Sequence, residues 1–127
     1  MAHRIAVIDD EENIVKMIEL RLKSRGYDVI TGCNGEDALR LAKTKPDLMI
    51  IDVMMPPPNG FQVCREIKKS PETAMIPVIL LTARSKQADK FWGKEANADI
   101  YLTKPYSAQE LFSAVESLIK PVSGQNP

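Results

Sequence analysis

Short apolar runs alternate with longer amphipathic segments along most of the chain. The apolar runs stand at residues 5–8, 29–30, 48–51, 78–81 and 100–102. Residues 48–51 and 78–81 are almost continuously apolar, which is typical of strands that are buried on both faces of a parallel sheet. This pattern predicts five short strands.

The segments between these runs carry apolar residues at helical spacing. Three such stripes consist of Ile14, Val15, Ile18 and Leu22, of Val63, Cys64 and Ile67, and of Leu111, Phe112, Val115, Leu118 and Ile119. Asn34, Asn59 and Ser107 occupy positions suited to N-caps, and Ser107 with Glu110 makes a capping box. Gly26 is placed to end the first helix.

Strands that alternate with helices predict an α/β fold, in which helices cover both faces of a parallel sheet. Residues 86–95 give the weakest of the five helix predictions, because their apolar stripe is thin. We expect residues 1–120 to form one domain, which suits a chain of 127 residues. Residues 121–127 are rich in Pro, Ser, Gly, Asn and Gln, and we expect them to form a flexible tail or the start of a linker.

Composition and charge exclude several classes of protein. The 17 basic and 17 acidic residues give a formal net charge of zero, whereas a general affinity for nucleic acid requires a basic excess. No apolar run approaches the roughly 20 residues of a membrane span, and the N-terminus lacks the apolar stretch of a secretory signal. Cys33 and Cys64 form no CxxC pair, and we interpret them as reduced core or near-core residues. We therefore expect a cytoplasmic protein that binds neither nucleic acid nor membrane directly.

Polar residues follow four of the five predicted strands. Asp9 and Asp10 follow the first, Asp52 the third and Thr82 the fourth, and Lys104 comes shortly after the fifth. The carboxyl ends of parallel strands lie at one edge of the sheet, where α/β proteins carry their reactive groups. Three carboxylates, one hydroxyl and one ammonium group are therefore expected to meet at this edge.

The three carboxylates predict a cation site. Two carboxylates about 5 Å apart repel each other by about 3 kcal/mol at an effective dielectric constant of about 20. A divalent cation removes this repulsion, and oxygen ligands favour Mg²⁺, which also binds phosphate oxygens. A carboxylate beside the metal could attack a phosphoryl donor and form an acyl phosphate, with Mg²⁺, Lys104 and Thr82 neutralising the transferred group. Taken singly, Asp9 and Asp10 could be a helix-start pair, and Lys104 could be a surface lysine.

From residue 4 to about residue 120, the chain closely resembles the receiver domains of two-component response regulators. The resemblance rests on Val-Ile-Asp-Asp-Glu at residues 7–11, Asp-Val-Met-Met-Pro at residues 52–56 with Gly60 beyond it, Leu-Thr-Ala at residues 81–83 and Tyr-Leu-Thr-Lys-Pro-Tyr at residues 101–106. It implies a flavodoxin-like, doubly wound sheet of five parallel strands in the order 2-1-3-4-5, with five helices. It also implies a signalling switch that catalyses only its own phosphorylation and dephosphorylation, not an enzyme.

The same resemblance implies a role for each acidic residue. Asp52 looks like the phosphoacceptor, which receives phosphate from a sensor histidine kinase or a phosphotransfer protein. Asp10 resembles a direct Mg²⁺ ligand and Asp9 a ligand through water. Asp52 and the backbone carbonyl of Met54 would complete the protein's share of the coordination, with Mn²⁺ as a substitute metal.

The resemblance also implies how the switch is read out. Lys104 would pair with the phosphoryl group, and Pro105 would shape the loop through a cis peptide bond with Lys104. Thr82 would move toward the phosphate on activation, and Tyr101 would turn inward behind it. These movements would change the face made by the fourth helix, fifth strand and fifth helix, which would bind a downstream target or a second copy of the chain.

Pro57 is the main departure from the family pattern, because family members usually carry glycine at this position. Pro58 follows it, so the loop beside Asp52 is stiff and poor in hydrogen-bond donors. This leaves open a second hypothesis, a receiver-like module that binds partners without being phosphorylated. A haloacid-dehalogenase-like phosphatase would instead carry its aspartate nucleophile after the first strand. A flavodoxin-like flavin protein would need a loop rich in Ser, Thr or Gly where residues 9–12 are all acidic.

Overall fold

The computed structural model describes residues 2–83 and 96–119, in which strands and helices alternate. The strands are β1 (Arg4–Ile8), β2 (Asp28–Gly32), β3 (Leu48–Asp52), β4 (Val78–Thr82) and β5 (Ile100–Thr103). The helices are α1 (Glu12–Lys23), α2 (Gly35–Ala42), α3 (Gly60–Lys69) and α5 (Ala108–Leu118). All five predicted strands are present, and these four helices confirm four of the five helix predictions. The remaining helix, expected at residues 86–95, lies outside the described residues and stays a prediction. None of the helices in the described ranges is long and apolar enough to cross a membrane.

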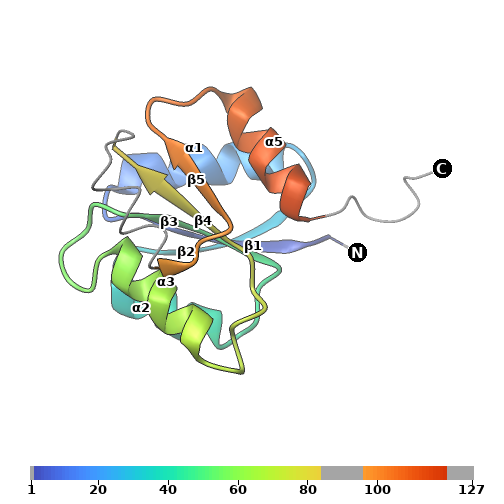
Figure 1. Cartoon of the computed structure of the whole chain (residues 1–127). Coiled ribbons are helices and arrows are strands. Elements are labelled where there is room, and N and C mark those ends of the chain that lie inside the picture. Colours follow the sequence, from blue (N-terminus) through green and yellow to red (C-terminus); the bar gives the residue numbers. More distant parts are fainter. Residues whose placement is uncertain (1, 84–95, 120–127) are drawn as a thin grey trace.

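The five strands form one parallel sheet in the order β2-β1-β3-β4-β5, which confirms the expected topology. α1 and α5 cover one face of this sheet, and α2 and α3 cover the other (Figure 1). β2 is an edge strand, as predicted, and β1, β3 and β4 occupy the centre. The carboxyl ends of these three central strands therefore lie next to one another.

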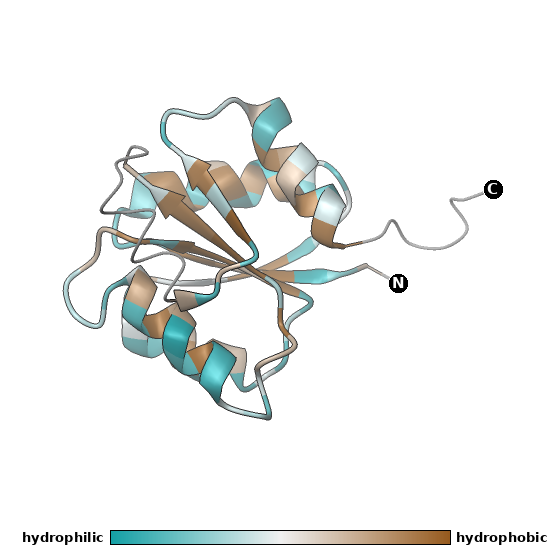
Figure 2. Cartoon of the chain, in the orientation of Figure 1, coloured by the Kyte–Doolittle hydropathy of each residue, from teal (hydrophilic) through white to brown (hydrophobic). Residues whose placement is uncertain are grey.

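Apolar side chains of the central strands fill the space on both faces of the sheet. Every residue of β3 and β4 is buried, and these strands are largely brown in Figure 2. Successive residues point to opposite faces, so Ile50 joins the core under α1 and α5, while Met49 and Ile51 join the core under α2 and α3. The predicted helical stripes complete both cores, as the fully buried Ile18 and Val63 show. Burial of this apolar surface on both faces holds the strand ends, and hence the site, in place.

The predicted N-cap residues stand at the starts of three helices. The side chains of Asn34, Asn59 and Ser107 each accept a hydrogen bond from a backbone N–H in the first turn of a helix. The predicted capping box at Ser107 is present, and a second one, which was not predicted, joins Asn59 and Gln62 at the start of α3. Gly26 follows α1 with a φ of +90°, a conformation that glycine adopts without steric cost.

The two cysteines lie in different environments. Cys64 on α3 is buried, as predicted, and its thiol donates to the Ala96 carbonyl at 3.3 Å. Burial raises the pKa of the Cys64 thiol to about 12. Cys33 is exposed, so the prediction that it lies in or near the core is wrong. It follows the edge strand β2, and its thiol donates to a carboxylate oxygen of Asp37 at 3.4 Å instead of packing inward.

Candidate functional site

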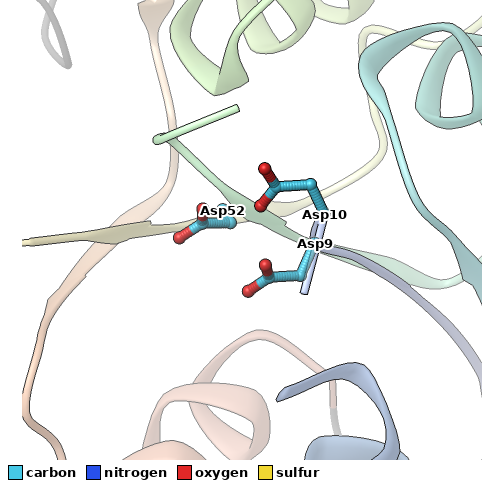
Figure 3. A group of neighbouring side chains, drawn as sticks. All are labelled: Asp9, Asp10 and Asp52. Atoms are coloured by element: carbon cyan, nitrogen blue, oxygen red, sulfur yellow. The ribbon is translucent and has the colours of Figure 1, made fainter. Parts of the chain in front are cut away.

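The carboxyl ends of β1 and β3 bring three carboxylates together. Ile8 pairs with Ile51 in the sheet, so Asp9 and Asp52, the next residues along, lie side by side. One carboxylate oxygen from each of Asp9, Asp10 and Asp52 lies within 4.8 Å of the others. Figure 3 shows the three side chains gathered where these strands end. The predicted convergence of acidic residues is therefore confirmed.

Lys104 reaches the cluster from the end of β5. Its backbone N–H donates to the Thr82 carbonyl at 2.8 Å, which holds the segment after β5 against the end of β4. Its Nζ donates to Asp52 Oδ1 at 2.6 Å, and the Asp52 side chain is only 3% exposed. The peptide bond between Lys104 and Pro105 is cis, as the resemblance implies. The buried carboxylate of Asp52 is thereby paired with a cation, which a buried charge requires.

Asp9 and Asp10 are adjacent in the chain but differ in burial. Asp10 is exposed, whereas Asp9 is 2% exposed. Asp9 Oδ1 accepts a hydrogen bond from the Glu11 N–H at 2.9 Å. Among the residues that the structure describes, the buried Oδ2 of Asp9 has no hydrogen-bond partner. A buried carboxylate oxygen without a partner is costly, and here it indicates that a cation belongs in the cluster.

Burial governs the acid–base behaviour of the site. Burial raises the pKa of the Asp9 carboxyl to about 6; the Glu11 N–H acts against this, and the charge of Asp52 adds to it. Burial also raises the pKa of Asp52, although the hydrogen bond from Lys104 acts in the opposite direction. Burial alone would lower the pKa of Lys104, but its pairing with Asp52 outweighs burial and raises it. The protein on its own therefore stabilises the ionised Asp9 poorly.

The donor set of the cluster fits Mg²⁺. Carboxylate oxygens are the ligands that Mg²⁺ prefers, and the ion usually keeps several waters, which the exposed position of Asp10 allows. The backbone N–H of Met54 acts to lower the pKa of Asp52, so this part of the loop lies near the cluster. Asp9, Asp10 and Asp52 could thus hold a divalent cation. The predicted role of the Met54 carbonyl as a further ligand stays a prediction.

The remaining predicted site residues lie at different distances from the cluster. Thr82 ends β4 and is 5% exposed, one residue beyond Leu81, which pairs with Asp52. Tyr101 pairs with Leu80 farther back along the sheet and packs, partly buried, against the core under α2 and α3. The structure therefore places Thr82 at the same edge as the cluster and Tyr101 farther back along the sheet, against the core. Their proposed roles in switching stay predictions.

Tyr106 lies near the site, although the sequence indicated no role for it. Burial raises the pKa of its hydroxyl; the charges of Lys104 and Arg21 act against burial, and those of Asp9 and Asp52 add to it. The Tyr106 ring also packs, partly buried, against the core under α1 and α5. In the sequence, only its position directly after Lys104 and Pro105 suggested that Tyr106 lies near the site, and this is weak evidence for a single aromatic residue.

The chain matches a known protein family and several curated proteins. The family model for the response regulator receiver domain matches residues 5–116. The alkaline phosphatase synthesis transcriptional regulatory protein PhoP of Bacillus subtilis (strain 168) is 42% identical over 121 residues, which are 94% of this chain and 50% of that protein. The chain spans about half the length of the curated relatives it matches.

Two solved structures illustrate the shared fold, at 36% and 28% identity. The signal receiver domain of a signal transduction histidine kinase from Syntrophus aciditrophicus matches with a TM-score of 0.89 and 36% identity, covering 96% of this chain and 93% of that one. The receiver domain of a sensor histidine kinase from Pseudomonas aeruginosa PAO1 matches with a TM-score of 0.85 and 28% identity, covering 93% and 98%. That second structure has a magnesium ion coordinated in its active-site cleft. This chain belongs to the family of response regulator receiver domains of two-component signalling systems.

Proposed function

We propose that this receiver domain is switched by phosphorylation of Asp52. The observation that supports this most is the position of the Asp52 carboxylate. It is buried, lies 2.6 Å from the Lys104 ammonium, and has a carboxylate oxygen of Asp9 and of Asp10 within 4.8 Å. A carboxylate held in this way can act as the nucleophile of a phosphoryl transfer. The domain is a signalling switch and not a classical enzyme, so the proposed catalysis is limited to gain and loss of its own phosphoryl group.

The proposed step transfers a phosphoryl group from nitrogen to oxygen. A carboxylate oxygen of Asp52 attacks the phosphorus of a phosphohistidine on the donor protein. A phosphorus–oxygen bond forms to Asp52 as the phosphorus–nitrogen bond breaks, and the imidazole leaves with both bonding electrons and takes up a proton. The product is an acyl phosphate, which water later hydrolyses to regenerate the Asp52 carboxylate.

Lys104 and Thr82 act on the phosphoryl oxygens in this proposal. The Lys104 ammonium already donates a hydrogen bond to Asp52 Oδ1. When the acyl phosphate forms, the ammonium can donate to a phosphoryl oxygen instead. Thr82 stands at the same sheet edge and can donate its hydroxyl to a second oxygen. Pro105 shapes the turn that aims Lys104, and Tyr101 adjusts its packing behind Thr82. The phosphate is thereby held by donors that come from two neighbouring strands.

Asp9, Asp10, Asp52 and the Met54 carbonyl would hold Mg²⁺, with Mn²⁺ as a substitute. The ion would neutralise charge on the phosphoryl oxygens, which is the main requirement of such a transfer. The protein's contribution is to hold three carboxylates close together and to leave the buried Oδ2 of Asp9 without another partner in the described part of the chain.

The partners of this switch follow from the same proposal. The phosphoryl donor is a sensor histidine kinase or a phosphotransfer protein. The output surface combines β5 and α5 with the helix expected at residues 86–95, and it binds a downstream target or a second copy of the chain. The domain boundary at residue 120, the tail at residues 121–127, the cytoplasmic location and the lack of direct nucleic-acid binding remain predictions.

The proposal is tested by intact-mass spectrometry after incubation with acetyl phosphate, with Mg²⁺ or with EDTA. Wild type should gain one phosphoryl group only with Mg²⁺, and Asp52→Asn should gain none. Asp28→Asn is the matched control, because it makes the same change at the exposed start of β2. Asp28→Asn should be labelled as wild type is. No labelling of wild type by acetyl phosphate or by a phosphorylated donor would favour the phosphorylation-independent module, which the proline-rich loop left open.

A further inference from the structure

The loop between β3 and α3 is fixed by backbone hydrogen bonds at its two ends. At the β3 end, the Val53 N–H donates to the Leu81 carbonyl at 3.0 Å. At the α3 end, the Gly60 N–H donates to the Val53 carbonyl at 3.2 Å, which draws the two ends together. A Cβ on Gly60 would lie 2.6 Å from the Asp52 carbonyl oxygen, so this closure requires glycine. Met54, whose carbonyl is a proposed metal ligand, lies between these fixed ends.

The middle of the same loop consists of three prolines at residues 56–58. Because proline has no backbone N–H, none of them can donate a hydrogen bond that would hold the loop. Pro56 and Pro57 are exposed, whereas Pro58 is partly buried and lies against the first residue of α2, Gly35. Packing of Pro58 on Gly35 therefore replaces the missing hydrogen bonds as a constraint on the middle of the loop.

Gly35 permits this contact because it has no side chain. A Cβ at this position would overlap the Pro58 carbonyl oxygen and would lie 2.6 Å from Pro58 Cγ and 3.0 Å from Val63 Cγ2. The overlapping oxygen belongs to the backbone, so a side-chain rotation cannot relieve the clash. The start of α2 is itself fixed, because Asn34 Oδ1 accepts the Asp37 N–H at 2.7 Å. A larger residue at position 35 must therefore displace the loop.

We propose that Gly35 is a positioning residue for the metal site. It sets the path of the β3–α3 loop through Pro58, and the loop in turn sets where the Met54 carbonyl lies beside Asp52. Only Pro56 and Pro57 separate Pro58 from Met55, whose N–H donates to the Val53 carbonyl at 2.9 Å. Because proline restricts the backbone, a displacement at Pro58 is transmitted to the Met54–Met55 peptide, which carries the Met54 carbonyl. This inference rests on the proposed function, in which Met54 supplies an oxygen ligand to Mg²⁺.

The first test replaces Gly35 and measures Mg²⁺ binding by isothermal titration calorimetry. Gly35→Ala should weaken Mg²⁺ binding by about tenfold or more, as is typical when a group that orients a metal ligand is lost. Acetyl-phosphate labelling should slow at low Mg²⁺ and recover at high Mg²⁺. A purely structural role would change the metal-free melting temperature and leave the Mg²⁺ Kd unchanged. Gly26→Ala is the control. Its cost in folding stability comes from backbone strain at a φ of +90°, because nothing lies within 4 Å of the new Cβ and no other segment is displaced.

The second test releases the loop from the other side and applies even if Gly35→Ala fails to fold. Pro58→Gly removes the ring that contacts Gly35, and Pro57→Gly makes the same change at the neighbouring exposed proline. Pro58→Gly should weaken Mg²⁺ binding more than Pro57→Gly. In the Pro58→Gly background, Gly35→Ala should cause a smaller further loss than it causes in wild type, because the loop can then yield.

The outcomes separate this inference from the proposed function. Wild type that binds Mg²⁺ and is labelled establishes the function whatever the Gly35 variants do. Given that result, a folded Gly35→Ala with the wild-type Mg²⁺ Kd would overturn the positioning role. Equal effects of Pro57→Gly and Pro58→Gly, or the same loss from Gly35→Ala in both backgrounds, would also overturn it. A wild type that neither binds Mg²⁺ nor is labelled would overturn the function and this inference with it.

Discussion

Replacement of Asp9 by asparagine should stabilise the metal-free protein while weakening its Mg²⁺ site. Asp9 is 2% exposed, and its Oδ2 has no partner among the described residues, so its ionised form is poorly stabilised. Asparagine keeps an oxygen that can accept the Glu11 N–H and removes the charge that the fold stabilises poorly. The cluster therefore costs stability in the absence of the cation, and Asp9→Asn should recover part of that cost.

The pKa of Asp9 sets the size and the pH range of this effect. Burial raises the pKa of the Asp9 carboxyl from 3.8 to about 6. At a pH between these two values, Asp9 therefore keeps a proton in the folded state that it has lost in the unfolded state. Wild-type stability should thus fall as pH rises from about 4 through about 6, and the full penalty applies above that range. At about 1.4 kcal/mol per pKa unit, the penalty at pH 8 is at most about 3 kcal/mol. This limit corresponds to roughly 10 °C in the melting temperature of a domain of this size.

The assay is thermal unfolding at pH 8 and at pH 4.5, in EDTA and in Mg²⁺. In EDTA, Asp9→Asn should melt above wild type at pH 8, and the difference should shrink at pH 4.5, where Asp9 is protonated. Mg²⁺ should raise the melting temperature of wild type more than that of the variant, because stabilisation follows RT ln(1 + [Mg²⁺]/Kd). Glu66→Gln, at an exposed position on α3, is the control for loss of one negative charge.

Two results would show that the charge of Asp9 does not destabilise the metal-free protein. The first is a metal-free Asp9→Asn that is no more stable than wild type at pH 8, which would mean that the ionised Asp9 carboxylate does not destabilise the folded state. The second is a gain of equal size at pH 4.5 and pH 8, which would mean that the gain comes from something other than the charge.

Three further predictions concern single contacts. Lys104→Gln removes the ammonium that donates to Asp52, and it should slow acetyl-phosphate labelling by roughly a hundredfold while Mg²⁺ still binds. Labelling at the wild-type rate would contradict the proposed role of Lys104. Ser107→Ala removes the N-cap of α5 and should cost about 1 kcal/mol in urea unfolding, whereas an unchanged midpoint would show that the cap contributes nothing. Lys68→Met leaves Asp99 and the Ile76 carbonyl without the Lys68 ammonium and should cost about 1–3 kcal/mol; a neutral result would show that packing alone holds this segment.

The order of the elements and the place of the site were predictable because both follow from periodicity and topology. The apolar runs at residues 48–51 and 78–81 are buried on both faces, and the polar residues that follow the central strands meet at one edge. Only the parallel arrangement was needed to bring Asp9 and Asp52 together. The position of each acidic residue at a strand end therefore carried most of the information about the site.

Differences within the site were not predictable, because they depend on packing between distant segments. The family resemblance gives Asp9 and Asp10 different ligand roles, but nothing in the sequence indicates that Asp9 is buried and Asp10 exposed. Cys33 was expected near the core, but it follows an edge strand, and its thiol donates a hydrogen bond to Asp37 of α2. The contact between Gly35 and Pro58 joins residues 23 positions apart, and no local pattern indicates it.

Chemical localisation of the acyl phosphate would show whether Asp52 is the residue that carries the phosphoryl group. Borohydride reduces an acyl phosphate of aspartate to homoserine, which tandem mass spectrometry can assign to a single position. After treatment with acetyl phosphate and Mg²⁺, we expect homoserine at position 52 in wild type and in Asp28→Asn, and none in EDTA. Homoserine at position 9 or 10, or a phosphorylated protein that yields no homoserine, would contradict it.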